Sequence, residues 1–350
     1  MKKALIAMSG GVDSSVAAYL ALKAGYDCIG VTMHLQGNKD AMDAQARDAK
    51  AVADRLGIPF QVLDFQAQFR AHVMDAFVQS YENGLTPNPC VVCNRYLKFG
   101  RLLEAAEAMG CDAIVTGHYA QIFYNPETDR YAIKKAFDEV KDQSYFLYAL
   151  SQAQLSRIQF PLGSLSKAQA REIALEQGFL TAKKKDSQDI CFIPDGDYLS
   201  FMTAYTGKTY PCGNFLDMDG NVVGQHKGAV GYTLGQRKGL GLAMGEPVYV
   251  CDKDMQANTV TVGTNASLMR QALRATDWFW HTIKELKEPI RVQAKARSRM
   301  SAQNATVYPE ENGSARVVFD EPQRALTPGQ AVVLYDGDIV VGGGTITEIL

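Results

Sequence analysis

A short apolar run that leads straight into a glycine- and serine-rich turn constrains this chain more than any other feature. Ala4–Met8 has the composition of a buried strand, the turn Ser-Gly-Gly follows, and a helix is expected to begin at about Asp13. In this order, backbone N–H groups and the positive end of the helix dipole form a cradle for phosphate. Gly10 and Gly11 permit the positive φ and the close backbone approach that such a turn needs. The segment therefore predicts a phosphate site.

The side chains of this loop indicate which phosphate chemistry to expect. Asp13 is suited to hold Mg²⁺ beside the phosphates of ATP, and further hydroxyl donors come from Ser9, Ser14 and Ser15. The lysine-containing loop GxxxxGK[ST] is absent, because Gly207-Lys208-Thr209 has Met at position 202 where the upstream glycine would stand. The sequence SGGVDS instead resembles the pyrophosphate loop of ATP pyrophosphatases, which attach AMP to a carbonyl oxygen and release pyrophosphate.

Composition indicates a globular protein without a membrane span. Apolar residues make up 47% of 350 residues, yet no apolar run approaches the roughly 20 residues that a spanning helix needs. The N-terminus leads directly into a core strand, so we expect no signal peptide and a cytoplasmic location. The net charge of −2 does not indicate nucleic-acid binding, but residues 270–299 hold eight Lys or Arg against three Asp or Glu. Such a run is either a solvated surface or a local basic face for RNA.

Strands and helices alternate up to about residue 200, after which the pattern changes. The alternation predicts an α/β fold with a doubly wound parallel sheet and ligands at the carboxyl ends of its strands. Beyond residue 205, turn pairs and short alternating stretches predict antiparallel strands. We therefore expect an ATP pyrophosphatase catalytic domain over 1–205, a central β-rich domain over 206–268 and a C-terminal antiparallel β-barrel over 269–350. Within the first domain, the expected strands are 4–8, 28–35, 60–64 and 113–116, and the expected helices are 14–24, 39–56, 67–81 and 96–109.

Seven cysteines in such a chain suggest chemistry or a metal rather than a disulfide framework. Four have simple interpretations: Cys28, Cys111 and Cys251 as small core residues, and Cys212 as a turn residue. The other three, Cys90, Cys93 and Cys191, lie among polar and turn residues.

Two of these thiols lie in electropositive segments. The loop Thr86–Arg95 delivers Cys93 close to an expected helix start and to Arg95 and Lys98, which predicts a lowered thiol pKa. Cys191 follows three lysines at 183–185. An adenylating loop with two activated thiols suits a reaction that first activates an oxygen and then displaces it with sulfur.

The chain resembles the tRNA-specific 2-thiouridylases over nearly its whole length. SGGxDS alone is shared with several kinds of enzyme, whereas the combination of the cysteine-containing loop with KDQSYFL and ICFI is far more specific. The motifs that carry the resemblance are SGGVDSS, TPNPxxxCNRxxKF (86–99), TGHYA (116–120), KDQSYFL (141–147), ICFI (190–193), YTLGQRKGLG (232–241) and LTPGQAVVLYDGD (326–338).

The resemblance implies a tRNA-uridine 2-sulfurtransferase that works in three steps. ATP adenylates the carbon-2 oxygen of the wobble uridine, and a persulfide on Cys191 then supplies sulfur to that carbon. Cys93 attacks the persulfide and leaves a transient Cys93–Cys191 disulfide, with AMP as the leaving group at the carbon. The resemblance also implies that a cysteine desulfurase or a sulfur-carrier protein donates the sulfur, and that tRNAs for Lys, Glu and Gln accept it.

Further positions take their expected roles from the resemblance one by one. Asp13 joins the two cysteines as a catalytic residue. Met33 and Gly117 are expected to flank the adenine or ribose, while the rest of the nucleotide pocket is expected at Ala7, Met8, Ser9, Gly10, Gly11, Val12, Asp13 and Ser14. Contacts with tRNA, the flipped target base included, are expected at Asn88, Pro89, Cys90, His118, Lys141, Asp142, Gln143, Arg297, Ser298 and Gln330.

One departure from the family concerns position 90, where many members have an aspartate and this chain has Cys90. The change removes a candidate acid or base near the target carbonyl. It also creates a third thiol, so that Cys90, Cys93 and Cys191 together would suffice for an iron–sulfur cluster with one open iron. The two-cysteine mechanism without a metal is the preferred interpretation.

Two other functions remain open from the residues alone. An ATP-dependent amidating or lysidine-forming ligase has the same first loop but needs no cysteine pair, so it would survive loss of Cys93 and Cys191. An RNA- or nucleotide-binding module with a structural zinc would need a fourth ligand beyond the three thiolates.

Overall fold

The structure is a computed structural model that describes residues 2–37, 39–184 and 190–350. Its catalytic part is built on a five-stranded, wholly parallel sheet in the order β3-β2-β1-β4-β7. These strands are β1 (Lys3–Ala7), β2 (Asp27–His34), β3 (Phe60–Asp64), β4 (Ala113–Val115) and β7 (Ile158–Gln159). The predicted doubly wound parallel sheet is confirmed, and each predicted strand lies within about a residue of its expected bounds.

Helices cover both faces of this sheet because successive residues of β1 point to opposite faces. Ala4 and Ile6 are buried against α1 (Val12–Lys23), α2 (Lys39–Leu56) and α8 (Lys167–Glu176). Leu5 is buried against α6 (Leu102–Ala108) on the other face. Both faces of the central strand β1 are therefore buried in the core. This burial holds the strand in place and so fixes the position of the phosphate loop at its carboxyl end.

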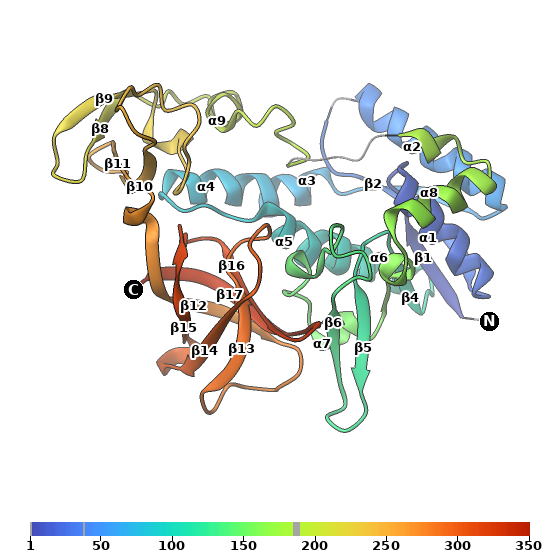
Figure 1. Ribbon diagram of the computed structural model, residues 1–350. Coiled ribbons are helices and arrows are strands. Elements are labelled where there is room, and N and C mark those ends of the chain that lie inside the picture. The colour runs from blue at the N-terminus through green and yellow to red at the C-terminus, as the bar shows by residue number, and fades with distance from the viewer. Residues whose placement is uncertain (1, 38, 185–189) are drawn as a thin grey trace.

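Two long helical segments cross the middle of the molecule (Figure 1). The first comprises α3 (Gln66–Phe69), a π-helical stretch at Arg70–Asp75 and α4 (Ala76–Glu82). The second comprises α5 (Pro89–Cys93), a π-helical stretch at Asn94–Arg101 and α6. It begins at Pro89 rather than at the predicted Tyr96, because Pro89 occupies the first helical position and the Asn88 side chain caps the helix by accepting the Val91 N–H at 3.4 Å. The remaining α-helices are α7 (Gln152–Leu155) and α9 (Tyr198–Thr206).

A small β-rich unit lies at the far end of α4 from the parallel sheet (Figure 1). Its four strands pair in the order β10-β11-β8-β9, with β11 and β8 parallel and the other pairs antiparallel. They are β8 (Gly213–Leu216), β9 (Val222–His226), β10 (Tyr249–Asp254) and β11 (Thr259–Gly263).

The C-terminal strands close into an antiparallel six-stranded barrel, as predicted. The order β12-β15-β14-β13-β16-β17 is closed by pairing of β12 with β17. The strands are β12 (Met269–Trp280), β13 (Ile290–Lys295), β14 (Gln303–Pro309), β15 (Ala315–Arg324), β16 (Ala331–Asp336) and β17 (Ile339–Ile349). Sequence analysis missed a hairpin of β5 (Gln121–Asn125) and β6 (Arg130–Lys134), whose second strand pairs with β17 at Lys134 and Ile339. The hairpin lies beside the barrel in Figure 1, so the catalytic part and the barrel share one sheet.

Candidate active site

The predicted phosphate loop connects β1 to α1 with the geometry that phosphate binding requires. Gly10 has φ +67°, and a Cβ added there would lie 2.9 Å from the Gln45 carbonyl oxygen, so only glycine fits. Gly11 is different: its φ of −105° is accessible to any residue, and the predicted need for positive φ is wrong there. The Ser14 hydroxyl accepts the Ser9 N–H at 3.0 Å. The turn is thus held by its own hydroxyl groups at the N-terminus of a buried helix.

The other residues predicted for nucleotide binding lie at the same edge of the sheet. Gly117 follows β4, and a Cβ there would lie 2.7 Å from the carbonyl carbon of Asp13 and 2.8 Å from the amide nitrogen of Ser14. Glycine at 117 therefore lets this loop pack directly on the start of α1. Met33 lies near the end of β2 and is half-buried. The structure brings the predicted nucleotide residues together at the carboxyl ends of β1, β2 and β4.

Asp13 is held by two residues that sequence analysis did not single out. Lys167 donates to both carboxylate oxygens at 2.7 Å each, and the Tyr119 hydroxyl donates to Oδ1 at 2.8 Å. Tyr119 lies in the TGHYA motif, so that motif gave a partial signal. Lys167 is 154 positions from Asp13, and no local pattern indicates that the two residues meet.

Cys93 is buried, and the predicted lowering of its pKa is wrong. Its side chain packs in an apolar cluster with Phe69 and Phe192, and this burial raises the pKa of the Cys93 thiol although Lys98 acts in the opposite direction. Because the helix begins at Pro89, Cys93 lies inside it, and the exposed Cys90 lies nearer its N-terminus. We therefore expect Cys93 to be a thiol, not a thiolate, at neutral pH in the free protein.

Cys191 lies close to the other two thiols although it comes 98 positions after Cys93 (191 minus 93). Its neighbours Phe192 and Ile193 are buried in the same apolar cluster as Cys93, and Gln36 donates to the Cys191 carbonyl oxygen at 2.8 Å. Desolvation raises the pKa of the Cys191 thiol, and the nearby thiols of Cys93 and Cys90 raise it further. The Cys191 side chain nevertheless remains exposed to solvent.

The apolar cluster that contains Cys93 also holds two residues of the ICFI motif in place. The Phe192 ring makes edge contacts with Phe69 and Phe77, at centroid distances of 5.8 Å and 5.2 Å. Burial of Phe192 and Ile193 therefore anchors Cys191 over the helix that carries Cys93. The basic segment predicted to activate Cys191 falls partly at 185–189, outside the described residues.

The cysteines of the described residues are free thiols, Cys90, Cys93 and Cys191 among them. Within 2–37, 39–184 and 190–350, no group of three or more His, Cys, Asp or Glu side chains is arranged to hold a metal ion. Of the remaining cysteines, Cys28 and Cys111 are buried, whereas Cys251 is only partly buried and Cys212 is exposed.

Several side chains predicted to contact tRNA make contacts within the protein. Asp142 accepts the Ala136 and Ser144 N–H groups at 3.0 Å and 3.2 Å, and Gln143 accepts the Tyr119 N–H at 2.9 Å. These bonds shape the loop that carries Lys141, which is half-buried.

Gln330 and Arg297, also predicted to contact tRNA, connect the barrel to its neighbours. Gln330 donates to the carbonyl oxygens of Thr86 and Pro87, at 2.9 Å and 3.3 Å, and so fixes the loop before Cys90. Arg297 donates to the Leu234 carbonyl and the Thr327 hydroxyl, and its buried Nε is without a hydrogen-bond partner in the described structure. Ser298 beside it is half-buried.

His118 is a neutral side chain at neutral pH. Its ring lies among aromatic residues, 5.6 Å from the Phe99 centroid and 5.8 Å from that of Phe160, and Nδ1 is 2.7 Å from the Thr116 hydroxyl. Burial, assisted by Lys98, holds the pKa of His118 well below its usual 6.5. Any contact with tRNA at this position would therefore involve a neutral imidazole.

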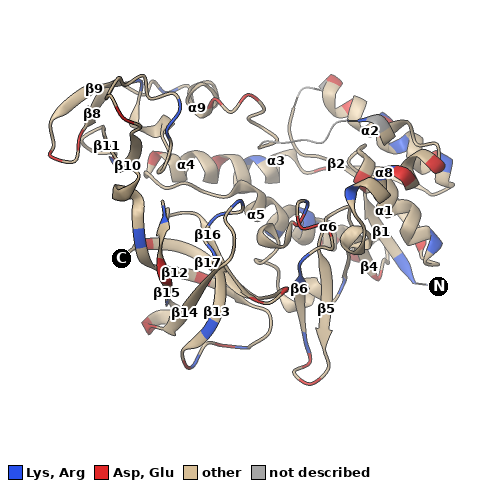
Figure 2. Ribbon diagram, viewed as in Figure 1, with Lys and Arg blue, Asp and Glu red and all other residues tan. Residues whose placement is uncertain are grey.

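The strands of the barrel carry both basic and acidic residues (Figure 2). Within the basic run, Arg274 pairs with Glu310 and Glu348, and Arg291 pairs with Asp320. By contrast, Arg270 and Arg324 donate to backbone or amide oxygens. In the run 270–299, two arginines are therefore neutralised by acidic side chains, and Arg270 is bonded to uncharged groups.

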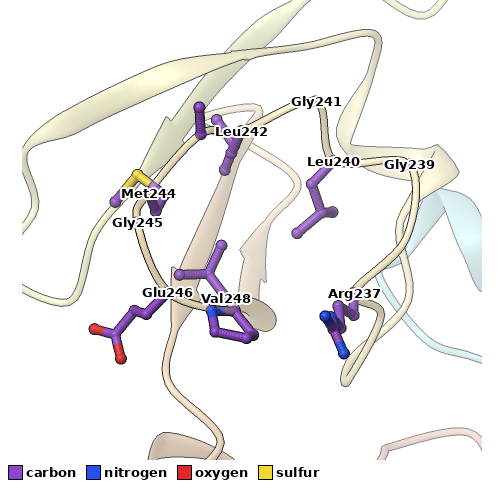
Figure 3. A pocket seen from close by; sticks show the side chains of 11 residues that line it. Arg237, Gly239, Leu240, Gly241, Leu242, Met244, Gly245, Glu246 and Val248 are labelled. Atoms are coloured by element: carbon purple, nitrogen blue, oxygen red, sulfur yellow. The ribbon is translucent and has the colours of Figure 1, made fainter.

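A separate hollow of about 450 Å³ lies in the glycine-rich loop between Arg237 and Val248, which contains part of the predicted YTLGQRKGLG motif. Figure 3 shows Leu240 pointing into the space that this loop encloses, with Arg237 at one side. None of its lining residues belongs to the phosphate loop or the cysteine cluster. No helix in the described part of the chain is long and apolar enough to cross a membrane.

A phosphate loop at the edge of a parallel sheet, with clustered thiols nearby, defines a nucleotide-binding α/β protein equipped for thiol chemistry. Comparison with known families is more specific. The chain matches a tRNA methyl transferase HUP domain over residues 2–195, a tRNA methyl transferase PRC-barrel domain over 200–264 and an aminomethyltransferase β-barrel domain over 270–346.

Curated relatives identify the family. A tRNA-specific 2-thiouridylase MnmA of Clostridioides difficile is 46% identical over 100% of this chain and 99% of its own length. The enzyme of the same name from Acetivibrio thermocellus is 47% identical over 99% of both chains. The chain belongs to the tRNA-specific 2-thiouridylase family.

Proposed function

We propose that the protein is an ATP-dependent tRNA sulfurtransferase that converts the wobble uridine to 2-thiouridine. The observation that carries the proposal is that Cys191 lies near Cys93, because the residues that follow Cys191 pack in the same cluster as Cys93, within a chain that also has a complete phosphate loop. A carbonyl oxygen is a poor leaving group until it is esterified to AMP, and the phosphate loop provides for that step. The donor set at the loop fits Mg²⁺, since Asp13 offers carboxylate oxygens beside the phosphate cradle. When bound there, the ion would neutralise charge on the phosphates.

The sulfur step then needs the two cysteines in different roles. In our proposal the terminal sulfur of a Cys191 persulfide attacks carbon 2, and the carbon–oxygen bond breaks, so that the uridine oxygen leaves in AMP. Cys93 next attacks the Cys191 sulfur, which breaks the sulfur–sulfur bond, releases the thiolated base and forms a Cys93–Cys191 disulfide. An external thiol must reduce this disulfide before the next turnover. Sulfur would come from a cysteine desulfurase or a sulfur-carrier protein, and the acceptors would be tRNAs for Lys, Glu and Gln.

Burial of Cys93 suits the role of resolving thiol. A protonated, covered Cys93 does not attack the persulfide before tRNA binds. The proposal therefore includes a local rearrangement on tRNA binding that exposes Cys93 and brings it to Cys191. Asn88, Pro89 and Cys90, at the start of the same helix, are the proposed contacts with the flipped base, and His118, Lys141 and Ser298 are further proposed contacts with the tRNA.

A single turnover tests the disulfide step. Persulfide-loaded enzyme is mixed with ATP and tRNA without reductant, and its peptides are analysed by mass spectrometry under non-reducing conditions. We expect a Cys93–Cys191 disulfide in the wild type and in Cys90→Ser, and none in Cys93→Ser. A disulfide from Cys191 to Cys90 instead would show that the resolving thiol is assigned to the wrong residue.

A further inference from the structure

Lys167 reaches the phosphate loop from another helix, and neither sequence motif nor mechanism has assigned it a role. A second lysine, Lys184, also approaches the loop, but its ammonium group donates to the Gly10 carbonyl oxygen at 3.0 Å and pairs with Asp48. Its Nζ lies 2.7 Å from each carboxylate oxygen of Asp13. The Lys167 side chain is only 12% exposed and that of Asp13 33%, so this pair is far less hydrated than a surface pair. The ammonium also lies 5.8 Å from the centre of the Tyr119 ring, on a second element of the site.

The position of Lys167 is fixed by the way α8 begins. Ser166 caps the helix and forms a reciprocal capping box with Gln169. The Lys167 backbone N–H donates to Asp138 at 2.9 Å. Further along, α8 buries Ala170 and Ala174 in the core that it shares with α1. The lysine is therefore held in place by packing and is aimed at the first turn of α1.

The loop itself lacks a cation where a polyanionic ligand must bind. Residues 7–15 contain no Lys or Arg, and Asp13 adds a negative charge. Backbone N–H groups and a helix dipole provide only partial positive charge. In GxxxxGK[ST] loops the lysine that reaches the phosphates is part of the loop, whereas here the candidate comes from a helix 154 positions downstream.

We propose that Lys167 is the cationic residue of the pyrophosphate site. It neutralises Asp13 in the free protein and turns to the β- and γ-phosphate oxygens when ATP binds. The inference rests on the proposed function, in which the uridine oxygen forms a bond to the α-phosphorus. The bond from that phosphorus to the bridging oxygen breaks, and its electron pair leaves with pyrophosphate. Lys167 keeps its proton throughout and stabilises the charge that develops on the leaving group.

A purely structural ion pair and a phosphate ligand predict different nucleotide affinities. AMP lacks the β- and γ-phosphates, so a residue that holds these groups contributes to ATP binding but not to AMP binding. A residue that only maintains the shape of the loop affects both nucleotides equally. The ratio of the two affinities therefore separates the roles.

The experiment measures binding of AMP and of a non-hydrolysable ATP analogue, each with Mg²⁺, to the full-length protein by calorimetry. For Lys167→Met we expect affinity for the ATP analogue to fall at least about tenfold, as for loss of a charge-assisted hydrogen bond, and affinity for AMP to change less than about twofold. Lys167→Arg should recover part of the loss. The matched control is Lys50→Met, because Lys50 makes the same two 2.7 Å bonds to Asp54 on the exposed face of α2.

Equal losses for both nucleotides, or no loss for either, would overturn the role of Lys167. If Lys167→Met does not fold, Lys167→Gln replaces it, because glutamine keeps an N–H donor for Asp13. We expect the same result for this variant: a loss of affinity for the ATP analogue of at least about tenfold, with little change for AMP. Failure of the proposed function gives a different result: the wild type itself would bind no ATP analogue or would make no thiouridine. A wild type that thiolates tRNA, together with a Lys167→Met variant of normal ATP affinity, refutes the inference alone.

Discussion

Replacing Cys191 with serine is expected to abolish formation of 2-thiouridine while leaving adenylation of the tRNA intact. Serine has nearly the shape of cysteine but carries no persulfide, so no sulfur reaches the activated carbon. The phosphate loop is a separate part of the structure, at the carboxyl end of β1. Pyrophosphate should therefore still be released, in an amount that reports the adenylated tRNA.

The measurement combines nucleoside analysis of the tRNA with a pyrophosphate assay on the same reaction. Cys212→Ser is the matched control, because Cys212 is another exposed free thiol and is not a member of the cluster of Cys93 and Phe192. It should retain full activity. Full sulfur transfer by Cys191→Ser would show that Cys191 does not carry the persulfide.

Replacing Asp13 with alanine is expected to stop the reaction one step earlier. The substitution removes the proposed Mg²⁺ ligand and leaves Lys167 and Tyr119 without their shared acceptor. Loss of one preorganised electrostatic group typically slows a reaction about 100- to 1000-fold, and we expect at least this loss in tRNA-dependent pyrophosphate release. The persulfide on Cys191 should still form, because that cysteine belongs to a different cluster.

Asp13→Asn separates chemistry from folding in this experiment. Asparagine keeps an acceptor for the Tyr119 hydroxyl but lacks the charge that holds a cation, so it should be nearly as inactive as alanine with a smaller loss of stability. Asp54→Ala, on the exposed face of α2, is the control and should behave as wild type. Normal pyrophosphate release by Asp13→Asn would show that this carboxylate is not needed for adenylation.

Local sequence patterns were sufficient to predict the elements that carry the phosphate loop. Ala4–Met8 alternates between two buried faces, and the glycines and serines that follow permit few backbone arrangements other than the one found. The strands of the barrel could be predicted equally well, because alternation in segments such as Arg316–Phe319 is typical of strands with one buried face.

The environment of the thiols was harder to predict because it depends on distant packing. Arg95 and Lys98 near Cys93 suggested an activated thiol, yet Phe192 and Ile193 arrive from almost one hundred residues downstream and cover it. Desolvation then outweighs the local positive charge. The sequence next to a cysteine therefore did not determine its pKa here.

Two further features involve partners too far apart in sequence to be paired without the fold. The ion pair between Lys167 and Asp13 depends on α8 packing against α1. Likewise, Gln330 reaches Thr86 and Pro87 only because the barrel lies against the catalytic part. Family motifs indicated that Gln330 mattered, but they did not show that its amide holds the loop before Cys90.

The most direct test of the account is the nucleoside content of tRNA after anaerobic incubation with ATP and a persulfide source. Protein as purified is compared with a metal-stripped sample to which only Mg²⁺ is returned. The account predicts 2-thiouridine in both samples and none without ATP. Thiouridine only in an iron-containing sample would contradict the two-cysteine mechanism and assign Cys90, Cys93 and Cys191 to a cluster. Absence of thiouridine from both samples would contradict the proposed function itself.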